Sequence, residues 1–517
     1  MRTNIERLNE LKERKARIMQ MGGEAAVEKQ HSRNKLTARE RIDLLFDTGT
    51  FNEIDILVKH RCTLFGMDEK EIPADAAISG YGKVQGRDVF IAAEDYSTLA
   101  GTFGEMHGKK FCKVLDFAAD AGVPFIQIID SGGARLQEGQ DASEMYAQVF
   151  RRHTLYSGVI PQISLLMGSC GGGAAYGPAL TDFIIMVDGI GHMYMGGPAF
   201  VRTMLGEEKT EADLGGAKVH SRITGLCDLV AKNDDHAIAM AKELLSFLPS
   251  NCKDKPPIIA TDDAPNRKNK NILNILPDNS KYPFDMRKVI IEVVDNGYFF
   301  ELKQDFAKNM ITGFARLNGR TVGILANQSI VKGGTIDVDA ANKHARFVRC
   351  CDCFNVPIIH FQDVPGVLIG QDEEYKGIIK IGSKMLHATT EATVPKITLV
   401  IRNSYAGGQL CMCNKPMGAD FVFAWPTAEI AGVGPETVAS VIYAKEIAAA
   451  QNPEEVREKR IKEYDDVWIN PYMAAARGYI DDVIEPEDTR HILINSLEVL
   501  RNKAEIHPWK KHSNIQM

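Results

Sequence analysis

Long apolar runs are absent from this 517-residue sequence, and no stretch approaches the length of about 18 residues that a membrane-spanning helix requires. Residues 1–30 also lack the apolar segment of a signal peptide, and Glu6, Glu10 and Glu13 are interleaved with the basic residues there. We therefore expect neither a signal peptide nor a transit peptide. Positive charge is not in excess, since the formal net charge is −7, which argues against nucleic acid as the main partner. These absences predict a cytoplasmic protein; a mitochondrial matrix location would require a transit peptide that has already been removed.

Paired cysteine spacings are also missing. The ten cysteines follow no regular pairing pattern, which predicts reduced thiols rather than a disulfide framework. The segments 350–353 and 411–413 invite a metal-binding interpretation, but neither has the two-residue gap of a zinc knuckle, and the first lies in a helical pattern over 343–354. We therefore expect no metal in this chain.

Glycine, by contrast, is concentrated in residues 168–178, which read GSCGGGAAYGP. They follow the apolar run 163–167, whose branched residues predict a buried strand that enters a turn. Three consecutive glycines leave main-chain N–H groups uncovered by any Cβ, so a ligand oxygen can approach them. A helix that begins there would also favour negative charge at its N-terminus. The stretch predicts either an oxyanion hole or close packing of a helix on a strand.

A long internal repeat runs through the chain. GRDV at 86–89 recurs as GRTV at 319–322, an offset of 319 − 86 = 233, and the same offset relates DSGG at 130–133 to DVPG at 363–366. With one inserted residue, the strand before the glycine stretch also repeats, and Gly173-Ala174 aligns with Gly407-Gly408. A repeat of this length indicates a duplicated domain rather than a solenoid. Two copies of one anion-binding turn suggest two enolate-like or oxyanion-like groups to be stabilised.

The domain boundaries follow from one irregular segment. Residues 251–283 contain paired prolines, paired aspartates and a KNKN run without any period, which is typical of a linker. We therefore predict an N-terminal domain over 1–250 and a C-terminal domain over 284–517, and the length suffices for two sizeable cores.

Local patterns predict α/β units with mostly parallel pairing. In the first domain we expect a hairpin over 77–95, a helix over 109–121 and a strand over 124–129. An earlier helix over 35–45 has Thr37 as its cap, with Glu40 three residues later as in a capping box. The basic residues of this helix either reach a phosphate or lie on a solvated face.

Polar residues follow the strand that ends at Asp130. Asp130 and Ser131 invite a nucleophile interpretation, but the surroundings do not match the G-x-S-x-G elbow, and the repeat has Val364 in place of Ser131. Because no complete triad is evident, we do not expect a serine hydrolase. Arg135 either contacts an anionic group of a ligand or forms a structural salt bridge.

Several longer motifs cover almost the whole chain. They are KLTARERIDLLFD at 35–47, DSGGARLQEG at 130–139, MGSCGGGAAYGPALTDF at 167–183, LGGAKVH at 214–220, NGRTVGILANQ at 318–328, DVPG at 363–366, AWPTAEIA at 424–431 and HPWKKHSNI at 507–515. With these motifs the chain resembles the carboxyltransferase (β) subunits of biotin-dependent acyl-CoA carboxylases, of the propionyl-CoA and methylcrotonyl-CoA carboxylase type.

The resemblance implies an α/β fold of two tandem crotonase-like (ClpP/crotonase) domains. It also implies an enzyme that moves a carboxyl group between carboxybiotin on a partner carrier and the α- or γ-carbon of an acyl-CoA, either propionyl-CoA-like or methylcrotonyl-CoA-like. In the family's proposed mechanism biotin itself removes the α-proton. The thioester and the biotin ureido group both develop negative oxygen, which main-chain N–H groups can hold.

Site residues are implied by position in the family motifs. Gly172 and Gly173 would hold the acyl-CoA carbonyl, and Gly407 and Gly408 would hold the biotin ureido oxygen. The other residues expected against the acyl-CoA are Gly132, Gly133, Ala134, Arg135, Ala174, Tyr176 and Leu410. Those expected against biotin are Pro365, Gly366, Tyr405 and Ala406.

The chain departs from the family in one stretch. Propionyl- and acetyl-CoA enzymes carry Y-G-G-A-Y-D-V-M where residues 405–412 read YAGGQLCM, so Leu410 replaces their specificity aspartate and removes a polar wall. We therefore expect the apolar wall to accept a different or longer acyl chain.

Two motifs of the complete reaction are missing, so partner chains are expected. No A-M-K-M-like biotin attachment site and no phosphate-cradling ATP motif occurs. A biotin carboxylase and/or a biotin carboxyl carrier subunit are therefore the expected partners. Family active sites form between the first domain of one subunit and the second domain of another, so the resemblance implies at least a dimer, and a hexamer as a trimer of dimers.

Two alternatives remain at this point. One is the carboxyltransferase subunit of a biotin-dependent, sodium-pumping acyl-CoA decarboxylase acting on methylmalonyl-CoA or glutaconyl-CoA, which would meet a membrane only through its partners. The other is a non-catalytic assembly subunit, since a fold alone never guarantees activity. Retention of both glycine turns argues against the second alternative.

Overall fold

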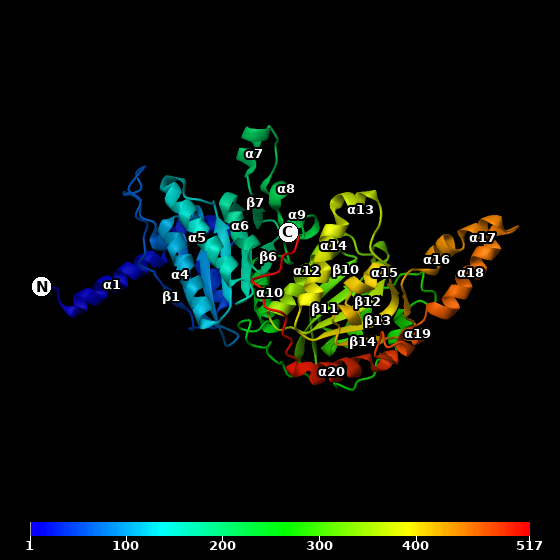
Figure 1. Ribbon diagram of the computed structural model, residues 1–517. Coiled ribbons are helices and arrows are strands. Elements are labelled where there is room, and N and C mark those ends of the chain that lie inside the picture. The colour runs from blue at the N-terminus through cyan, green and yellow to red at the C-terminus, as the bar shows by residue number, and fades with distance from the viewer. Residues whose placement is uncertain (1, 517) are drawn as a thin grey trace. The chain divides into compact units, whose positions relative to one another are not determined.

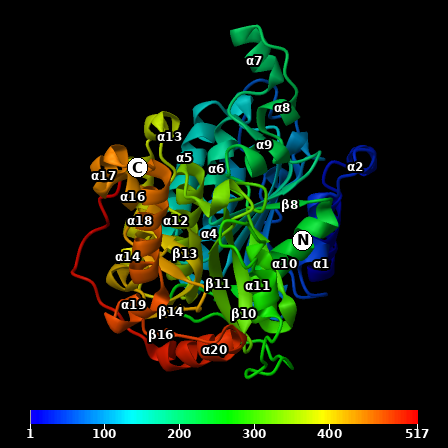
Figure 2. The same cartoon turned by 90° about the vertical axis from the view of Figure 1, so that its right-hand side faces the viewer.

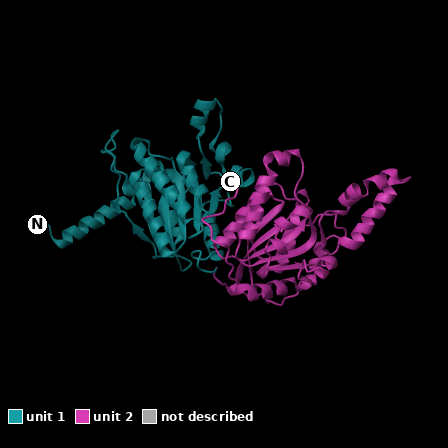
Figure 3. Ribbon diagram, viewed as in Figure 1, with its two compact units in different colours: residues 1–255 teal, residues 256–517 magenta. Residues whose placement is uncertain are grey.

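The computed structural model describes residues 2–516 of the chain (Figure 1). Its internal contacts divide the chain into unit 1 (residues 1–255) and unit 2 (residues 256–517), which Figure 3 shows in two colours. The division lies inside the segment predicted as a linker. Part of that segment is attached to unit 2 by main-chain hydrogen bonds, because Ile259 donates to Gly319 and Asn269 donates to Glu487.

Unit 1 is built on an eight-stranded sheet with the order β1-β2-β3-β4-β5-β6-β8, and β7 pairs with β5. Strands β1, β2 and β3 pair antiparallel, and all other pairs are parallel. The strands are β1 (Asn52–Ile54), β2 (Ala77–Val84), β3 (Arg87–Glu94), β4 (Phe125–Ser131), β5 (Gln162–Gly171), β6 (Phe183–Val187), β7 (His192–Tyr194) and β8 (Leu229–Ala231). Every residue of β4 is buried, as expected for a parallel strand covered on both faces.

Helices cover this sheet, and α4 and α5 contact each other on it (Figure 1). The helices are α1 (Asn4–Met19), α2 (Glu24–His31), α3 (Ala38–Leu45), α4 (Glu105–Ala121), α5 (Gln140–Tyr156), α6 (Tyr176–Ala179), α7 (Pro198–Leu205), α8 (Glu211–Gly215), α9 (Ala217–Arg222) and α10 (Asp234–Phe247). Neither α1 nor α7 contains a buried residue.

Several local predictions for unit 1 are confirmed. The hairpin is formed by β2 and β3, with its turn at Gln85-Gly86, where both φ angles are positive. The capping box of Thr37 and Glu40 opens α3. Helix α4 begins four residues before the predicted Lys109 and ends at the predicted Ala121, and Gly122, with a φ of 65°, provides a left-handed C-cap.

Unit 2 repeats the plan with the strand order β16-β14-β13-β12-β11-β10-β9, and β15 pairs with β13. Strands β9, β10 and β11 pair antiparallel, and the other pairs are parallel. The strands are β9 (Phe299–Leu302), β10 (Met310–Leu317), β11 (Arg320–Asn327), β12 (Ile358–Val364), β13 (Lys396–Tyr405), β14 (Phe421–Ala424), β15 (Glu429–Ala431) and β16 (Asp482–Val483).

Unit 2 also has its own set of helices. They are α11 (Met286–Val293), α12 (Val338–Cys353), α13 (Gln371–Lys376), α14 (Ile378–Glu391), α15 (Ala406–Cys411), α16 (Pro435–Ile442), α17 (Ala444–Ala449), α18 (Pro453–Trp468), α19 (Pro471–Ala476) and α20 (Thr489–Val499). In both views α20 lies along the lower end of unit 2 (Figures 1 and 2). Leu493 and Leu497 of α20 join Ile290 of α11 and residues of five strands, β10 to β14, in one apolar core.

The duplication predicted from the repeat is confirmed strand by strand. The first residues of β10, β11 and β12 follow those of β2, β3 and β4 by the same step, 310 − 77 = 320 − 87 = 358 − 125 = 233. For β13 and β5 the difference is 396 − 162 = 234, which includes the inserted residue. In each unit, therefore, the glycine turn follows the equivalent strand of that unit's own sheet.

The strand before the first glycine turn is longer than predicted. The apolar pattern indicated a strand over 163–167, whereas β5 continues to Gly171. The reason is a change of partner: β6 pairs with residues 163–166, and β7 then pairs with residues 169–171. The helix expected after the turn is short, because a 3₁₀ turn over Gly172–Ala175 leads into the four residues of α6.

Candidate active site

The glycine turn of unit 1 begins where β5 ends. Gly172 has a φ of 65°, in the left-handed region that favours glycine. A Cβ at Gly172 or at Gly173 would meet no atom closer than 3.8 Å. Packing therefore does not require glycine at position 173, and open space lies beside these main-chain groups. This arrangement suits close approach of a ligand better than it suits a tight helix–strand contact.

The turn of unit 2 occupies the equivalent place at the end of β13. Ala406 takes the left-handed conformation there, with a φ of 49°, at the position that corresponds to Gly172 (406 − 172 = 234). A Cβ at Gly407 would meet only Val367, at 3.8 Å, whereas a Cβ at Gly408 would lie 2.8 Å from Val364. Close packing thus explains the glycine at 408, and open space remains beside Gly407.

The main-chain N–H groups of these turns are free to donate hydrogen bonds to an anion. The first turn of a helix has no intrahelical partners for its N–H groups, and Gly407 and Gly408 lie in the first turn of α15. Among the hydrogen bonds between elements of residues 2–516, none starts from the main-chain N–H of Gly173, Gly407 or Gly408. Each turn can therefore donate to an oxygen atom of a bound ligand.

The loop after β4 lies beside the first turn. A Cβ at Gly133 would lie 3.1 Å from the carbonyl oxygen of Gly171, and Ala134 bridges to Phe103. The structure thus brings Gly132, Gly133 and Ala134 next to the Gly172 turn. Ala174 is buried within the 3₁₀ turn.

Arg135 forms a buried salt bridge. Its guanidinium contacts Asp75 at 2.5 Å and Glu138 at 2.7 Å, and donates to the carbonyl oxygen of Thr102 at 2.8 Å. The side chain is fully buried. Of the two interpretations of Arg135, the geometry therefore corresponds to the structural one, which fixes the loop that contains Ala134.

Tyr176 and Leu410 occupy equivalent positions after the two turns, since 410 − 176 = 234. Their side chains are 53% and 40% exposed, respectively. Both side chains lie at the surface of their units, shortly after the glycines of the turn in the sequence. There they can contact a substrate that is bound by the N–H groups of the turn.

The predicted biotin-binding residues surround the second turn. A Cβ at Gly408 would lie 3.0 Å from Gly366 Cα, so the segment Pro365-Gly366 lies directly against the turn. Tyr405 is the last residue of β13, and its hydroxyl donates to the carboxylate of Glu429 in β15. Tyr405 and Ala406 therefore form the junction between strand and turn.

Asp130 and Ser131 do not form a nucleophilic pair. Ser131 donates to the carbonyl oxygen of Gly101 at 2.6 Å, while Asp130 accepts from Lys35 at 2.6 Å and from Arg41 at 3.0 Å. Lys35 and Arg41 are buried, so both interpretations of the basic residues near α3, as phosphate ligands or as a solvated face, are wrong for these two. They neutralise an aspartate at the end of β4.

A cavity of about 400 Å³ borders the second turn. Ser404 and Gln409, which flank the turn on both sides, line it together with Gln362, Asn414, Trp468 and Arg477. Gln362 is 1% exposed, and its Nε2 has no hydrogen-bond partner within the described chain. Such an orphaned donor is costly unless a ligand or water satisfies it. Gln362 was not predicted as a site residue; the only signal in the sequence was a polar amide within the buried strand IIHFQDV of β12, which also contains His360 and Asp363.

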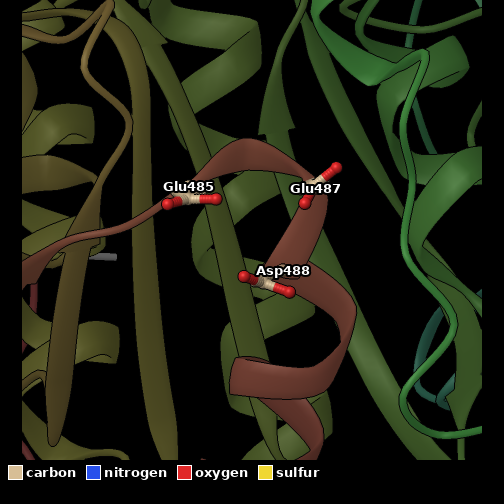
Figure 4. Close-up of side chains that lie close together, drawn as sticks. All are labelled: Glu485, Glu487 and Asp488. Atoms are coloured by element: carbon tan, nitrogen blue, oxygen red, sulfur yellow. The ribbon is translucent and has the colours of Figure 1, made fainter.

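One cluster of acidic side chains has the spacing of metal ligands. Within residues 2–516, Glu485, Glu487 and Asp488 lie close enough together to hold an ion (Figure 4). Lys268 contacts Glu487 at 2.7 Å and Asp488 at 3.1 Å, so part of this charge is already neutralised. None of the ten cysteines forms a disulfide within the described chain.

None of the helices among residues 2–516 combines the length and the apolar character needed to cross a membrane. The longest, α4 and α5, have 17 residues each and carry several charged side chains.

Comparison with known proteins gives one consistent result. The family model of the carboxyl transferase domain matches residues 29–515. A methylmalonyl-CoA decarboxylase subunit alpha from Propionigenium modestum is 45% identical, with 99% of each chain covered. A propionyl-CoA carboxylase carboxyltransferase subunit from Haloferax mediterranei is 46% identical, with 100% of each chain covered. A crystal structure of the transcarboxylase 12S hexamer, with methylmalonyl-coenzyme A and methylmalonic acid bound, superposes with a TM-score of 0.97 at 45% identity, covering 100% of this chain and 99% of that one.

Proposed function

Because the chain belongs to the carboxyl transferase domain family, we propose that unit 1 holds the acyl-CoA and unit 2 holds the carboxybiotin during transfer. The protein is an acyl-CoA carboxyltransferase that moves a carboxyl group between carboxybiotin and an acyl-CoA, and its fold consists of two tandem crotonase-like α/β domains. The assignment of one ligand to each unit is supported by the pair of equivalent glycine turns, one at the end of β5 and one at the end of β13.

The turn of unit 1 suits the thioester. When the α-carbon loses a proton or a carboxyl group, the electron pair moves to the thioester oxygen, and the N–H groups of Gly172 and Gly173 would donate to that oxygen. These donors are preorganised, so they stabilise developing charge without reorganisation. The loop Gly132–Ala134 would close the site from the neighbouring strand, and Arg135 would act on it only through the buried salt bridge that holds the loop.

The residues around the turn of unit 2 fit a biotin ring. Biotin, when bound, supplies a ureido nitrogen that carries the carboxyl group and a ureido oxygen that becomes more negative as CO₂ leaves. Gly407 and Gly408 would donate to this oxygen, with Pro365, Gly366, Tyr405 and Ala406 around it. The adjoining cavity of about 400 Å³ and the orphaned Nε2 of Gln362 support the presence of a polar ring with an acceptor at this place.

Propionyl-CoA and methylmalonyl-CoA are the proposed acyl substrates. The names of the relatives, a propionyl-CoA carboxylase and a methylmalonyl-CoA decarboxylase, describe one carboxyl transfer in opposite directions. Leu410 would form part of the acyl wall, since it follows the second turn and is 40% exposed. The direction would then depend on the partner, either a biotin carboxylase or a membrane-bound, sodium-pumping decarboxylase subunit.

Biotin would reach this chain on a partner carrier, and the chain would assemble as a hexamer. The 12S structure is described as a hexamer, and exposed apolar side chains on two projecting helices support assembly here. Phe200, Met204 and Leu205 on α7 are 63–69% exposed, and Val441 and Ile442 on α16 are 72% and 68% exposed. Figure 1 shows each helix on an arm that projects from its own unit.

Transfer of labelled carboxyl from methylmalonyl-CoA to free biotin, by the purified chain alone, tests the proposal. We expect label in biotin, and we expect Gly173→Val to lower the rate by at least about 100-fold, because a side chain there would cover a donor. The matched control is Gly177→Val, which changes the glycine of α6 that lies four residues further along the chain. In a panel of acyl-CoAs, Leu410→Asp should shift preference towards smaller acyl groups. A folded wild-type oligomer that transfers no label would contradict the proposal.

A further inference from the structure

A tyrosine occupies the last residue pair of the strand ladder before each glycine turn. In unit 1, Gly171 of β5 pairs with Tyr194 of β7; in unit 2, Tyr405 of β13 pairs with Ala431 of β15. The two pairs are equivalent, because 405 − 171 = 234 and 431 − 194 = 237, the offsets of their strands. The tyrosine has changed strands between the copies, yet each pair keeps one tyrosine and one small residue.

Each of these tyrosines donates a hydrogen bond to a glutamate. Tyr194 donates to Glu211 of α8 at 2.5 Å, and Tyr405 donates to Glu429 of β15. Burial, together with the hydrogen bond to the adjacent carboxylate, raises the pKa of both phenols. Both therefore remain protonated donors at neutral pH. The same interaction is thus built twice from residues that do not correspond in the repeat.

Each tyrosine adjoins the backbone that leads into its glycine turn. A Cβ at Gly171 would lie 3.0 Å from the ring of Tyr194, so this ring contacts the residue directly before Gly172. In unit 2, Tyr405 itself precedes Ala406, whose positive φ is unfavourable for a residue with a side chain. Such a conformation persists only where its surroundings hold it, and the direction of the next N–H groups depends on it.

We propose that Tyr194–Glu211 and Tyr405–Glu429 are positioning pairs, each of which fixes the N–H donors of its own glycine turn. The inference rests on the proposed function, in which the first turn holds the thioester oxygen and the second holds the ureido oxygen. Because each pair belongs to one unit, loss of one hydroxyl should slow the partial reaction at its own turn and leave the other partial reaction unchanged.

Two partial reactions of the full-length chain separate the turns. In the first, methylmalonyl-CoA without biotin releases CO₂: the bond between the α-carbon and the carboxyl group breaks, its electron pair moves to the thioester oxygen, and solvent returns a proton to the α-carbon. In the second, free carboxybiotin without acyl-CoA releases CO₂ and takes up a solvent proton at nitrogen. The first requires the donors of unit 1, and the second requires those of unit 2.

Tyr194→Phe and Tyr405→Phe remove the hydroxyl and keep the ring. Tyr194→Phe should lower kcat of the first partial reaction by about tenfold with little change in KM, which is the size of effect that loss of one supporting hydrogen bond gives, and should leave the second reaction at its wild-type rate. Tyr405→Phe should do the reverse. Tyr156→Phe removes a similar hydrogen bond, to Asp116 at 2.6 Å between α5 and α4, and should change neither rate.

Glu211 and Glu429 provide a second test that leaves the rings untouched. Glu211→Gln keeps an acceptor for the phenol, so it should retain more of the first partial reaction than Glu211→Ala does, and Glu429 should behave in the same way for the second. Equal loss of both partial reactions in every variant, or no loss in any correctly folded variant, would overturn the inference. A wild-type chain that catalyses neither reaction nor carboxyl transfer would contradict the proposed function itself, and the inference with it.

Discussion

Two buried histidines face each other inside unit 2. His344 of α12 and His360 of β12 have ring centroids 5.8 Å apart, and within the described chain none of their four ring nitrogens has a hydrogen-bond partner. Burial lowers the pKa of His344 to about 3 and that of His360 well below its ordinary value. In unit 1 the equivalent residues are Phe111 and Gln127 (344 − 233 and 360 − 233), and Gln127 donates to Ser164. Unit 2 thus buries ring nitrogens without hydrogen-bond partners among the described residues. At the equivalent positions of unit 1, Phe111 has no polar side-chain atom and Gln127 has a hydrogen-bond partner.

His344→Phe, which installs the residue of unit 1, should make unit 2 less sensitive to acid. Between pH 6.5 and about 3 the unfolded chain binds a proton at His344 that the native chain does not, so the free energy of unfolding falls as the pH falls below 6.5. The variant should therefore gain about 2 kcal/mol on the wild type when the pH is lowered from 7 to 5. Urea unfolding at both pH values measures this. The exposed His387 of α14, changed to Phe, is the control, and equal pH dependence in the wild type and His344→Phe would contradict the argument.

At the scale of elements, buried ion pairs join α3 to the rest of unit 1. Arg41 contacts Asp130 at 3.0 Å and Asp234 of α10 at 2.8 Å, and all three side chains are buried. In unit 2 the equivalent aspartate, Asp363 (363 − 130 = 233), contacts Arg402 of β13 at 2.9 Å. The position that corresponds to Arg402 in β5 is Gly168 (402 − 234), and a Cβ there would overlap the Asp130 carboxylate. Because the strand of unit 1 cannot supply the cation, α3 and the segment before it supply it.

Arg41→Met should therefore loosen α3 and destabilise unit 1. Removing one member of a buried ion pair leaves an uncompensated carboxylate and costs about 3–5 kcal/mol. Hydrogen exchange should show faster exchange in α3 and α10, with little change in unit 2. Arg14→Met breaks an exposed pair with Glu10 on α1 and should change stability by less than about 1 kcal/mol. If Arg41→Met unfolds with the same free energy as the wild type, the buried ion pairs of Arg41 make no net contribution to stability.

For the molecule as a whole, the helices α7 and α16 carry large apolar side chains that no other part of the described chain covers. Helix α7 has no buried residue, and on α16 only Val438 and Ala439 are buried. Both helices begin at a proline after a glycine and stand at equivalent places in the repeat, since 435 − 198 = 237. Apolar faces of this kind on two arms are typical of surfaces that another chain covers.

Leu205→Glu on α7 and Ile442→Glu on α16 should each reduce the mass of the assembly. A buried, unpaired carboxylate in a subunit interface is strongly unfavourable, so the proposed hexamer should separate into smaller species. Sedimentation or light scattering measures the mass, and circular dichroism should show that the units remain folded. Thr203→Glu, on the same helix but at a polar exposed position, is the control. An unchanged mass in both apolar variants would exclude these arms from the interface.

Much of the fold could be read from sequence, because the relevant interactions are local or repeated. The hairpin turn at Gln85-Gly86 and the capping box of Thr37 depend on neighbouring residues, and both stand where they were predicted. The constant offset between the two copies could be counted from short motifs, and it places whole strands correctly because duplicated sequences keep the same pattern of burial. The two glycine turns were found for the same reason.

Other features depend on residues that meet only after folding. Lys35 reaches Asp130 across 95 residues of sequence, and its role was misread because a buried cation and a solvated one look alike in a helical pattern. The extension of β5 depends on pairing with β7, which sequence periodicity does not record. The two tyrosine–glutamate pairs occupy different positions in the two copies, so the repeat itself hides them. Local pattern and duplication therefore specify the strands and the turns, whereas long-range packing and the cost of burying charge select the partners that hold those turns in place.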